Sequence, residues 1–208
     1  MKYRVHPSYR PFAQLPYCCV PATLQWILYR HGLDILDQES IGAELGLRLP
    51  LKGKKFFKKS GITFVSSEPK TGFGTRIEQT RFSIGQFFER KKIPLEISRL
   101  ILVNTKRELK KIIRDSLAAN RDVILRYNNR ICKQSGERSY GHFSVIVAFD
   151  EHSGRITIGD PELPYYKIVT LDQILFSISP KIDGIQRGLY VVQPRLIPRS
   201  RKNRHTRH

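Results

Sequence analysis

Apolar residues in the first half of the chain recur at helical spacing, most clearly in residues 21–30, PATLQWILYR. This segment consists mainly of good helix formers, with Pro21 in the first turn and Gly32 just past the end. Five of its side chains are apolar, which is typical of a buried helix. We therefore predict a buried helix that starts just after Cys19.

Other helices are predicted from local start signals. Thr105–Glu108 and Thr170–Gln173 have the spacing of capping boxes, and apolar residues follow each of them. The apolar residues that follow Thr105–Glu108 recur at helical spacing. Short helices are also expected over residues 38–45 and 83–91. Residues 50–75 are rich in lysine and glycine and are expected to form loops.

The second half of the chain changes to β-branched and aromatic runs separated by turn residues. The predicted strands cover residues 94–97, 123–127, 142–149, 155–158 and 189–192. Most of the helices precede an antiparallel meander of strands, and such segregation predicts an α+β fold rather than a doubly wound parallel sheet.

The composition is that of a folded but strongly basic protein. The chain has 208 residues, 40% of them hydrophobic, which argues against wholesale disorder, and a formal net charge of +19. Residues 195–208 carry six basic residues and no acid, and we expect them to form a disordered tail after a domain of residues 1–194.

A second basic cluster precedes the middle of the chain and comprises Lys52, Lys54, Lys55, Lys58 and Lys59. Phe56 and Phe57 interrupt the lysines, an arrangement that suits an anionic partner or a nucleic acid. The alternative is a solvated loop whose two aromatic rings enter the core. Excess charge alone does not distinguish these.

The cysteines and the hydropathy of the chain indicate the cellular compartment in which the protein is expected. The chain has three cysteines, two of them adjacent, which is not a disulfide framework and favours a reducing compartment. Adjacent cysteines also lack the spacer of a zinc site, so no metal or cofactor is expected. The sequence lacks an apolar run of signal-peptide or membrane-spanning length, and we expect a soluble, cytoplasmic protein with no transmembrane segment.

Four residues are candidates for chemistry. Cys19 precedes a predicted helix, where unpaired N–H groups and the helix macrodipole favour a thiolate. His142 opens one strand and Asp160 closes the next, and a turn at residues 152–154 would make them neighbours. Gln14 precedes the cysteine and can direct its amide N–H toward an oxyanion.

Around these four residues the sequence resembles the papain-like cysteine peptidases of the C39 type. The resemblance is carried by the glutamine, by residues 19–27, CVPATLQWI, by residues 142–147, HFSVIV, and by Asp160-Pro161, and it covers about residues 14–161. It implies a papain-like fold with N-terminal helices packed on a C-terminal antiparallel sheet. It also implies that Cys19 is the nucleophile, His142 the general base, Asp160 its orienting carboxylate and Gln14 the oxyanion donor, acting on a peptide or protein substrate.

The chain departs from that family around the cysteine. Cys18 and Val20 stand where the family usually has Asp and Gly, and the glutamine lies five residues upstream where six is common. These departures put the substrate in doubt more than the triad.

Alternatives to a peptidase remain open. The same groups serve acyl transfer when an amine accepts the acyl group, and a basic binding module could keep the same fold. Cys18 is expected to be a small buried hydrophobe and Cys132 to have no role. The remaining histidines, His6, His31, His152, His205 and His208, have no evident partner and are expected at the surface or in loops.

Overall fold

A computed structural model of the chain describes residues 1–69, 72–129, 140–163, 165–180 and 185–195. Its helices are α1 (Cys19–Arg30), α2 (Gln38–Glu44), α3 (Ile84–Arg90), α4 (Lys106–Ala118) and α5 (Leu171–Ile178), with the 3-10 helices η1 (Leu51–Phe56) and η2 (Thr80–Phe82). Its strands are β1 (Lys2–Arg4), β2 (Arg48–Pro50), β3 (Thr63–Val65), β4 (Leu95–Ile97), β5 (Asp122–Asn128), β6 (Gly141–Asp150), β7 (Arg155–Asp160), β8 (Tyr165–Thr170) and β9 (Gly188–Pro194).

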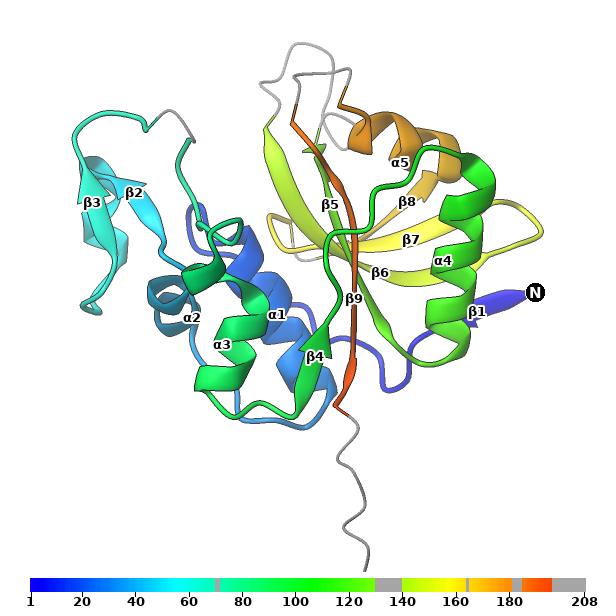
Figure 1. Ribbon diagram of the computed structural model, residues 1–208, viewed down its shortest axis with the longest axis horizontal. Coiled ribbons are helices and arrows are strands. Elements are labelled where there is room, and N and C mark those ends of the chain that lie inside the picture. Colours follow the sequence, from blue (N-terminus) through cyan, green and yellow to red (C-terminus); the bar gives the residue numbers. More distant parts are fainter. Residues whose placement is uncertain (70–71, 130–139, 164, 181–184, 196–208) are drawn as a thin grey trace, which may run out of the picture.

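Seven strands form one antiparallel sheet in the order β4-β9-β5-β6-β7-β8, and β1 pairs with β6 beyond the end of β5. Helix α1 lies against β6, α4 lies against both β5 and β6, and α5 lies against β5. Figure 1 shows these two groups of helices on opposite sides of the sheet. The fold is therefore a mixture of helices and an antiparallel sheet, as the segregated pattern predicts.

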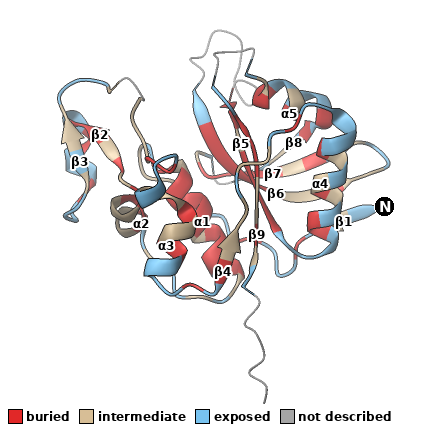
Figure 2. Ribbon diagram, in the orientation of Figure 1, coloured by how far each residue is buried: buried red, intermediate tan, exposed pale blue. Residues whose placement is uncertain are grey.

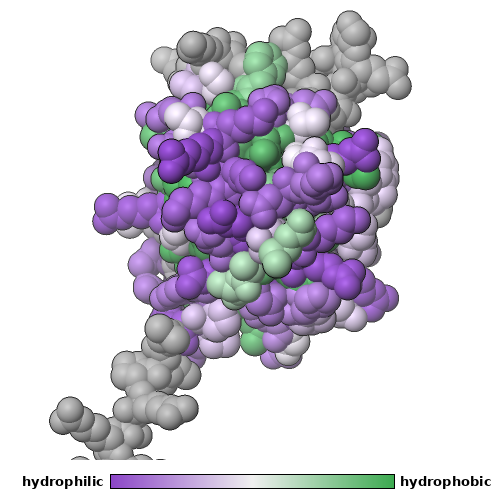
Figure 3. All heavy atoms as spheres, turned by 90° about the vertical axis from the view of Figure 1, so that its right-hand side faces the viewer, coloured by the Kyte–Doolittle hydropathy of each residue, from purple (hydrophilic) through white to green (hydrophobic). Residues whose placement is uncertain are grey.

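The core lies where the helices meet the sheet. In α1, nine of the twelve residues are buried, among them Trp26. Helix α4 is amphipathic instead, with Leu109, Ile113 and Leu117 buried beneath a hydrophilic outer face. Figure 2 shows the buried residues concentrated along α1 and the central strands, and Figure 3 shows the hydrophilic face on the α4 side.

The local start signals predict the helices well. Thr105 and Thr170 both form complete capping boxes, in which the threonine hydroxyl accepts an N–H three residues later and the Glu108 or Gln173 side chain accepts the cap N–H. Gly154, with φ of +67°, lies in the turn that folds β7 back onto β6. The predicted hairpin between these strands is confirmed.

Four strands, β1, β2, β3 and β8, and the two 3-10 helices were not predicted. Residues 50–75, expected to be loops, contain all of η1 and all of β3, which pairs in parallel with β2. Strand β1 is only three residues long, and β8 exposes several of its side chains at the sheet edge, so neither has a strong apolar pattern. The parallel β2-β3 pair stands outside the antiparallel sheet.

A second, smaller core lies beneath the β2-β3 pair. It consists of Cys18, Leu47, Leu49 and Phe57. Phe57 is buried, whereas Phe56 is exposed, so only one of the two aromatic rings enters the core. None of the helices within the described ranges has the length and the apolar composition that a membrane span requires.

Candidate active site

Cys19 is the first residue of α1, so the helix starts slightly earlier than predicted, and the Cys19 thiol is free and partly buried. The preceding residue, Cys18, caps the helix without a hydrogen bond from its side chain, and the first turn carries no acidic residue. The N–H groups and the positive end of the helix dipole are therefore directed toward the region of the Cys19 sulfur. Cys19 therefore occupies the N-terminal position of α1 that the sequence analysis expects for a nucleophile.

His142 and Asp160 form a buried pair at the end of the β6-β7 hairpin. His142 Nε2 lies 2.7 Å from Asp160 Oδ1, and both side chains are 1% exposed. Because a carboxylate only accepts hydrogen bonds, Nε2 carries the proton that joins the pair. The other ring nitrogen, Nδ1, is buried without a formed hydrogen bond to any described residue, and it is the atom left to face Cys19.

The charges of the three groups support one another. Burial of the His142 ring opposes its protonation, but the hydrogen bond to Asp160 and the nearby Cys19 outweigh burial and raise the pKa of His142 to about 9. Burial likewise opposes ionisation of Asp160, but the hydrogen bond and charge of His142, together with Lys167, lower the pKa of Asp160 to about 2. An imidazolium and an ionised carboxylate therefore coexist here over a wide pH range.

Lys167 is a member of this cluster that the sequence did not indicate. Its Nζ lies 2.8 Å from Asp160 Oδ2, so both carboxylate oxygens are bonded. The Glu162 backbone N–H also donates to Asp160 Oδ1, at 3.0 Å. Lys167 lies on β8, the edge strand whose pattern was too weak to predict, although a lysine among β-branched and aromatic residues was a possible signal.

Helix α1 is fixed to the strands that carry the pair. The Thr23 hydroxyl donates to the Phe143 carbonyl at 3.4 Å, one turn after Cys19. One turn further, the Trp26 ring fills the space above Gly159, where a Cβ would lie 2.4 Å from a ring carbon. Cys19, Thr23 and Trp26 share one face of the helix at spacings of four and three residues, so a single packed surface holds Cys19 beside His142.

Gln14 comes to the same region through its backbone. Its N–H donates to the Pro161 carbonyl at 2.8 Å, which ties the glutamine to the residue after Asp160. Its side-chain oxygen is buried without a hydrogen bond to any residue in the described ranges, so hydrogen bonds do not fix the amide orientation. Gln14 thus lies beside the His142–Asp160 pair, but among the described residues no hydrogen bond holds its amide N–H₂ toward the Cys19 region.

Gln38 supports this loop and was missed by sequence reasoning. Its Oε1 accepts the Leu15 N–H at 2.7 Å, and its Nε2 donates to the Ala13 carbonyl at 2.8 Å, on either side of Gln14. The side chain is buried at the start of α2. A glutamine at a helix start has no sequence signal that would reveal such a contact.

Two tyrosines line the imidazole. The rings of Tyr127 and Tyr140 meet the His142 ring edge to face, at centroid distances of 5.6 and 6.1 Å. The Tyr140 hydroxyl donates to Glu162, whose carboxylate lies within 4.8 Å of ligand atoms of both His142 and Asp160. The imidazole and the two carboxylates are close enough together to bind a cation. The His142–Asp160 hydrogen bond already accounts for the closeness of that pair.

The other predicted residues lie as follows. Cys18 is fully buried, and burial raises the pKa of its thiol, as expected of a small hydrophobe. The expectation that His31 lies at the surface or in a loop without a partner is wrong, because its ring bonds the buried Asp122 at 2.7 Å. Cys132, His205, His208 and the tail from residue 196 lie outside the described residues.

The basic cluster belongs to η1 and the segment after it. Lys59 forms an ion pair with Asp37, and the backbone N–H groups of Lys58 and Lys59 donate to Glu39 at 2.7 Å. Figure 1 shows this region at the edge of the molecule next to β2 and β3. The anionic-partner hypothesis for Lys52, Lys54, Lys55, Lys58 and Lys59 stays a prediction.

Comparison with known proteins gives a distant structural neighbour. No protein-family model and no curated protein sequence matches the chain. Among solved structures, the chain is similar to the crystal structure of Xylellain, a cysteine protease from Xylella fastidiosa, with a TM-score of 0.45 and 11% sequence identity over 93% of this chain and 85% of that one. At this distance the likeness decides nothing about the site.

Proposed function

We propose that the protein is a cysteine peptidase with a papain-like arrangement of Cys19, His142 and Asp160. The observation that carries the proposal is a thiol at a helix N-terminus beside a buried imidazole whose far nitrogen bonds a buried carboxylate. A nucleophile, a base and an orienting group in this relation are the parts that acyl transfer requires. The order of Gln14, Cys19, His142 and Asp160 along the chain supports assignment to the C39-like group.

The proposed reaction has two halves. The Cys19 thiolate attacks the carbonyl carbon of the peptide bond, and the resulting oxyanion accepts hydrogen bonds from the Cys19 N–H and the Gln14 amide. The C–N bond then breaks as His142 gives its Nδ1 proton to the leaving amine. In the second half, His142 takes a proton from water, the hydroxide attacks the thioester, and the carboxylic acid and the thiolate are released.

Asp160 and Lys167 hold the imidazole during this cycle. Asp160 keeps the proton on Nε2, which leaves Nδ1 for exchange with sulfur, amine and water. Lys167 bonds the second carboxylate oxygen and so restrains rotation of Asp160. Residues 1–194 would form the catalytic domain.

The direct test is alkylation of the thiols with iodoacetamide, followed by peptide mapping. We expect Cys19 to react fastest, because Cys18 is fully buried, and His142→Ala to slow the Cys19 reaction at least tenfold at neutral pH. The matched control is His31→Ala, which removes an imidazole bonded to a different buried carboxylate. Cys19 reactivity that is unchanged by His142→Ala would refute the triad.

A further inference from the structure

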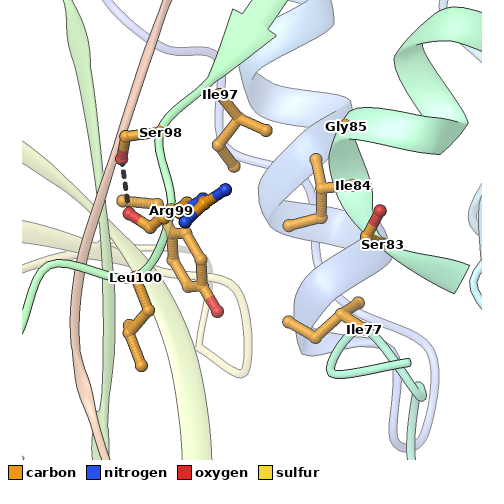
Figure 4. A pocket seen from close by; sticks show the side chains of 9 residues that line it. Ile77, Ser83, Ile84, Gly85, Ile97, Ser98, Arg99 and Leu100 are labelled. Atoms are coloured by element: carbon orange, nitrogen blue, oxygen red, sulfur yellow. Dashed lines mark hydrogen bonds between the residues drawn. The ribbon is translucent and has the colours of Figure 1, made fainter. Parts of the chain in front are cut away.

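A cavity of about 320 Å³ lies between α3 and the sheet, apart from the Cys19–His142–Asp160 cluster. Ile77 and Ile84 line it on the helical side, whereas Ile97 and Leu100 line it on the side of β4 and the segment that follows. Figure 4 shows Ile77 and Ile84 directed toward the strand side and Ile97 directed toward the space between the two halves. Its volume suits one or two apolar side chains of a bound chain rather than a large cofactor.

The cavity is connected to the catalytic strand through stacked rings. Phe143 follows His142 on β6, and its ring stacks on that of Tyr190, 6.3 Å away, which lines the cavity. Phe143 pairs with Arg126 of β5, and Arg126 pairs with Gly188 of β9. The strands β6 and β9 are thus two strand spacings, about 10 Å, apart, and an extended peptide, which advances about 3.3 Å per residue, crosses that interval in about three residues.

Arg99 supplies charge to the same cavity. Its side chain is exposed, and Figure 4 shows its guanidinium reaching from the strand side toward α3. Within the described ranges, Arg99 forms no ion pair. The acidic residues on the flanking segments are already bonded elsewhere: Glu78 to Arg126, Glu89 to Gln86 and Glu96 to Gln193. A guanidinium beside apolar walls suits a carboxylate next to an aliphatic group.

We infer that this cavity is a specificity site that accepts an aliphatic side chain of the peptide substrate, with Arg99 selecting peptides that carry an acidic residue beside it. The inference rests on the proposed function in taking the occupant to be a substrate peptide. The inferred substrates are peptides in which an aliphatic residue and an acidic residue are adjacent. The positive charge of the chain, +19, acts in the same direction.

Peptide binding to the full chain carrying Cys19→Ala tests the inference without requiring cleavage. The probes are fluorescein-labelled decapeptides of Gly, Ser and Gln that contain a central Leu-Glu, Leu-Gln or Ala-Glu pair, with affinity measured by anisotropy at fixed ionic strength. We expect Leu-Glu to bind about tenfold tighter than either of the other two, because each lacks one of the two contacts.

Substitution of Arg99 identifies the selecting group. We expect Arg99→Glu to abolish the preference for Leu-Glu over Leu-Gln and Arg99→Lys to retain part of it. The control is Arg107→Glu on the exposed face of α4, which makes the same change in net charge. Equal loss of binding in both charge reversals, or an unchanged preference in Arg99→Glu, would overturn the inference.

Cleavage of the same peptides by the unmodified protein separates the two proposals. If Leu-Glu peptides bind selectively but no peptide is cut, the cavity assignment stands and the peptidase assignment fails. If the protein cuts Leu-Glu, Leu-Gln and Ala-Glu peptides with equal kcat/KM, the peptidase assignment stands and the specificity site is refuted.

Discussion

Two buried carboxylates lie near opposite ends of helix α1, and each is bonded to a histidine and to a basic side chain. Asp160 bonds His142 Nε2 at 2.7 Å and Lys167 at 2.8 Å. Asp122 bonds His31 Nε2 at the same 2.7 Å and Arg30 at 3.2 Å. By its partners alone, either cluster could be taken for the acid and base of an active site.

The difference lies in what else each cluster contacts. Asp122 also accepts the Tyr9 hydroxyl at 2.6 Å, and Arg30 donates to the Asn120 carbonyl at 3.0 Å, so this cluster ties the N-terminal segment to α1 and β5. It lies at the negative end of the helix dipole, which suits cations. The Asp160 cluster lies at the positive end with a thiol. An Asp–His pair therefore indicates catalysis only when a nucleophile faces its free nitrogen.

Substitution of each histidine by alanine gives the largest expected difference between the clusters, in kcat/KM. We expect His142→Ala to lower kcat/KM for peptide hydrolysis at least a thousandfold, because the base and proton donor is lost. His31→Ala should change kcat/KM less than about threefold, since His31 contacts only the structural cluster. Similar losses in both variants, measured under conditions where both remain folded, would remove the distinction between the clusters.

The two aspartates should differ in the opposite sense when stability is measured. Asp122→Asn leaves the Arg30 guanidinium, 1% exposed, without its counter-charge, and we expect a loss of about 3 kcal/mol in the free energy of unfolding. Asp160→Asn should cost less, about 1 kcal/mol, because the buried His142 can release its proton, which Arg30 cannot, and Lys167 is 15% exposed and retains access to water. Urea unfolding of both variants tests this, and equal losses would contradict it.

The pH dependence gives the smallest effect. The pKa of His142 is raised from its ordinary value of 6.5 to about 9, so the imidazolium persists above that ordinary value and is lost as the pH rises through about 9. We expect kcat/KM to fall on this alkaline side. Lys167→Met removes a positive charge that opposes the imidazolium, and should move the alkaline limb upward by about half a unit.

Two controls accompany the pH measurement. Lys167→Arg keeps the charge beside Asp160 and should leave the limb in place. Lys106→Met removes an exposed lysine that pairs with Asp172 and should also leave it unchanged. A downward shift in Lys167→Met would show that Lys167 acts on the site in some other way.

Local features of the fold could be predicted because their causes are local. Capping boxes join residues three apart, and the hairpin that brings His142 to Asp160 depends on a short turn. Strand β8 was missed because its exposed, aromatic-rich pattern is that of an edge strand rather than a buried one. Lys167 was missed together with its strand.

Contacts between distant segments could not be predicted in the same way. His31 and Asp122 are separated by 91 positions, and nothing near either residue indicates the other. The same holds for Gln38, whose side chain bonds residues more than twenty positions earlier. Neighbouring Phe56 and Phe57 have opposite environments that only tertiary packing determines.

The only tryptophan of the chain, Trp26, lies on α1 between the two clusters and stacks closely over Gly159. Its indole N–H donates to the Phe12 carbonyl at 2.9 Å, and its ring is fully buried. The protein thus contains a single indole fluorophore, and it lies at the junction of α1 and the sheet. A red shift of the emission would report separation of Cys19 from the strands of His142 and Asp160 without any added label.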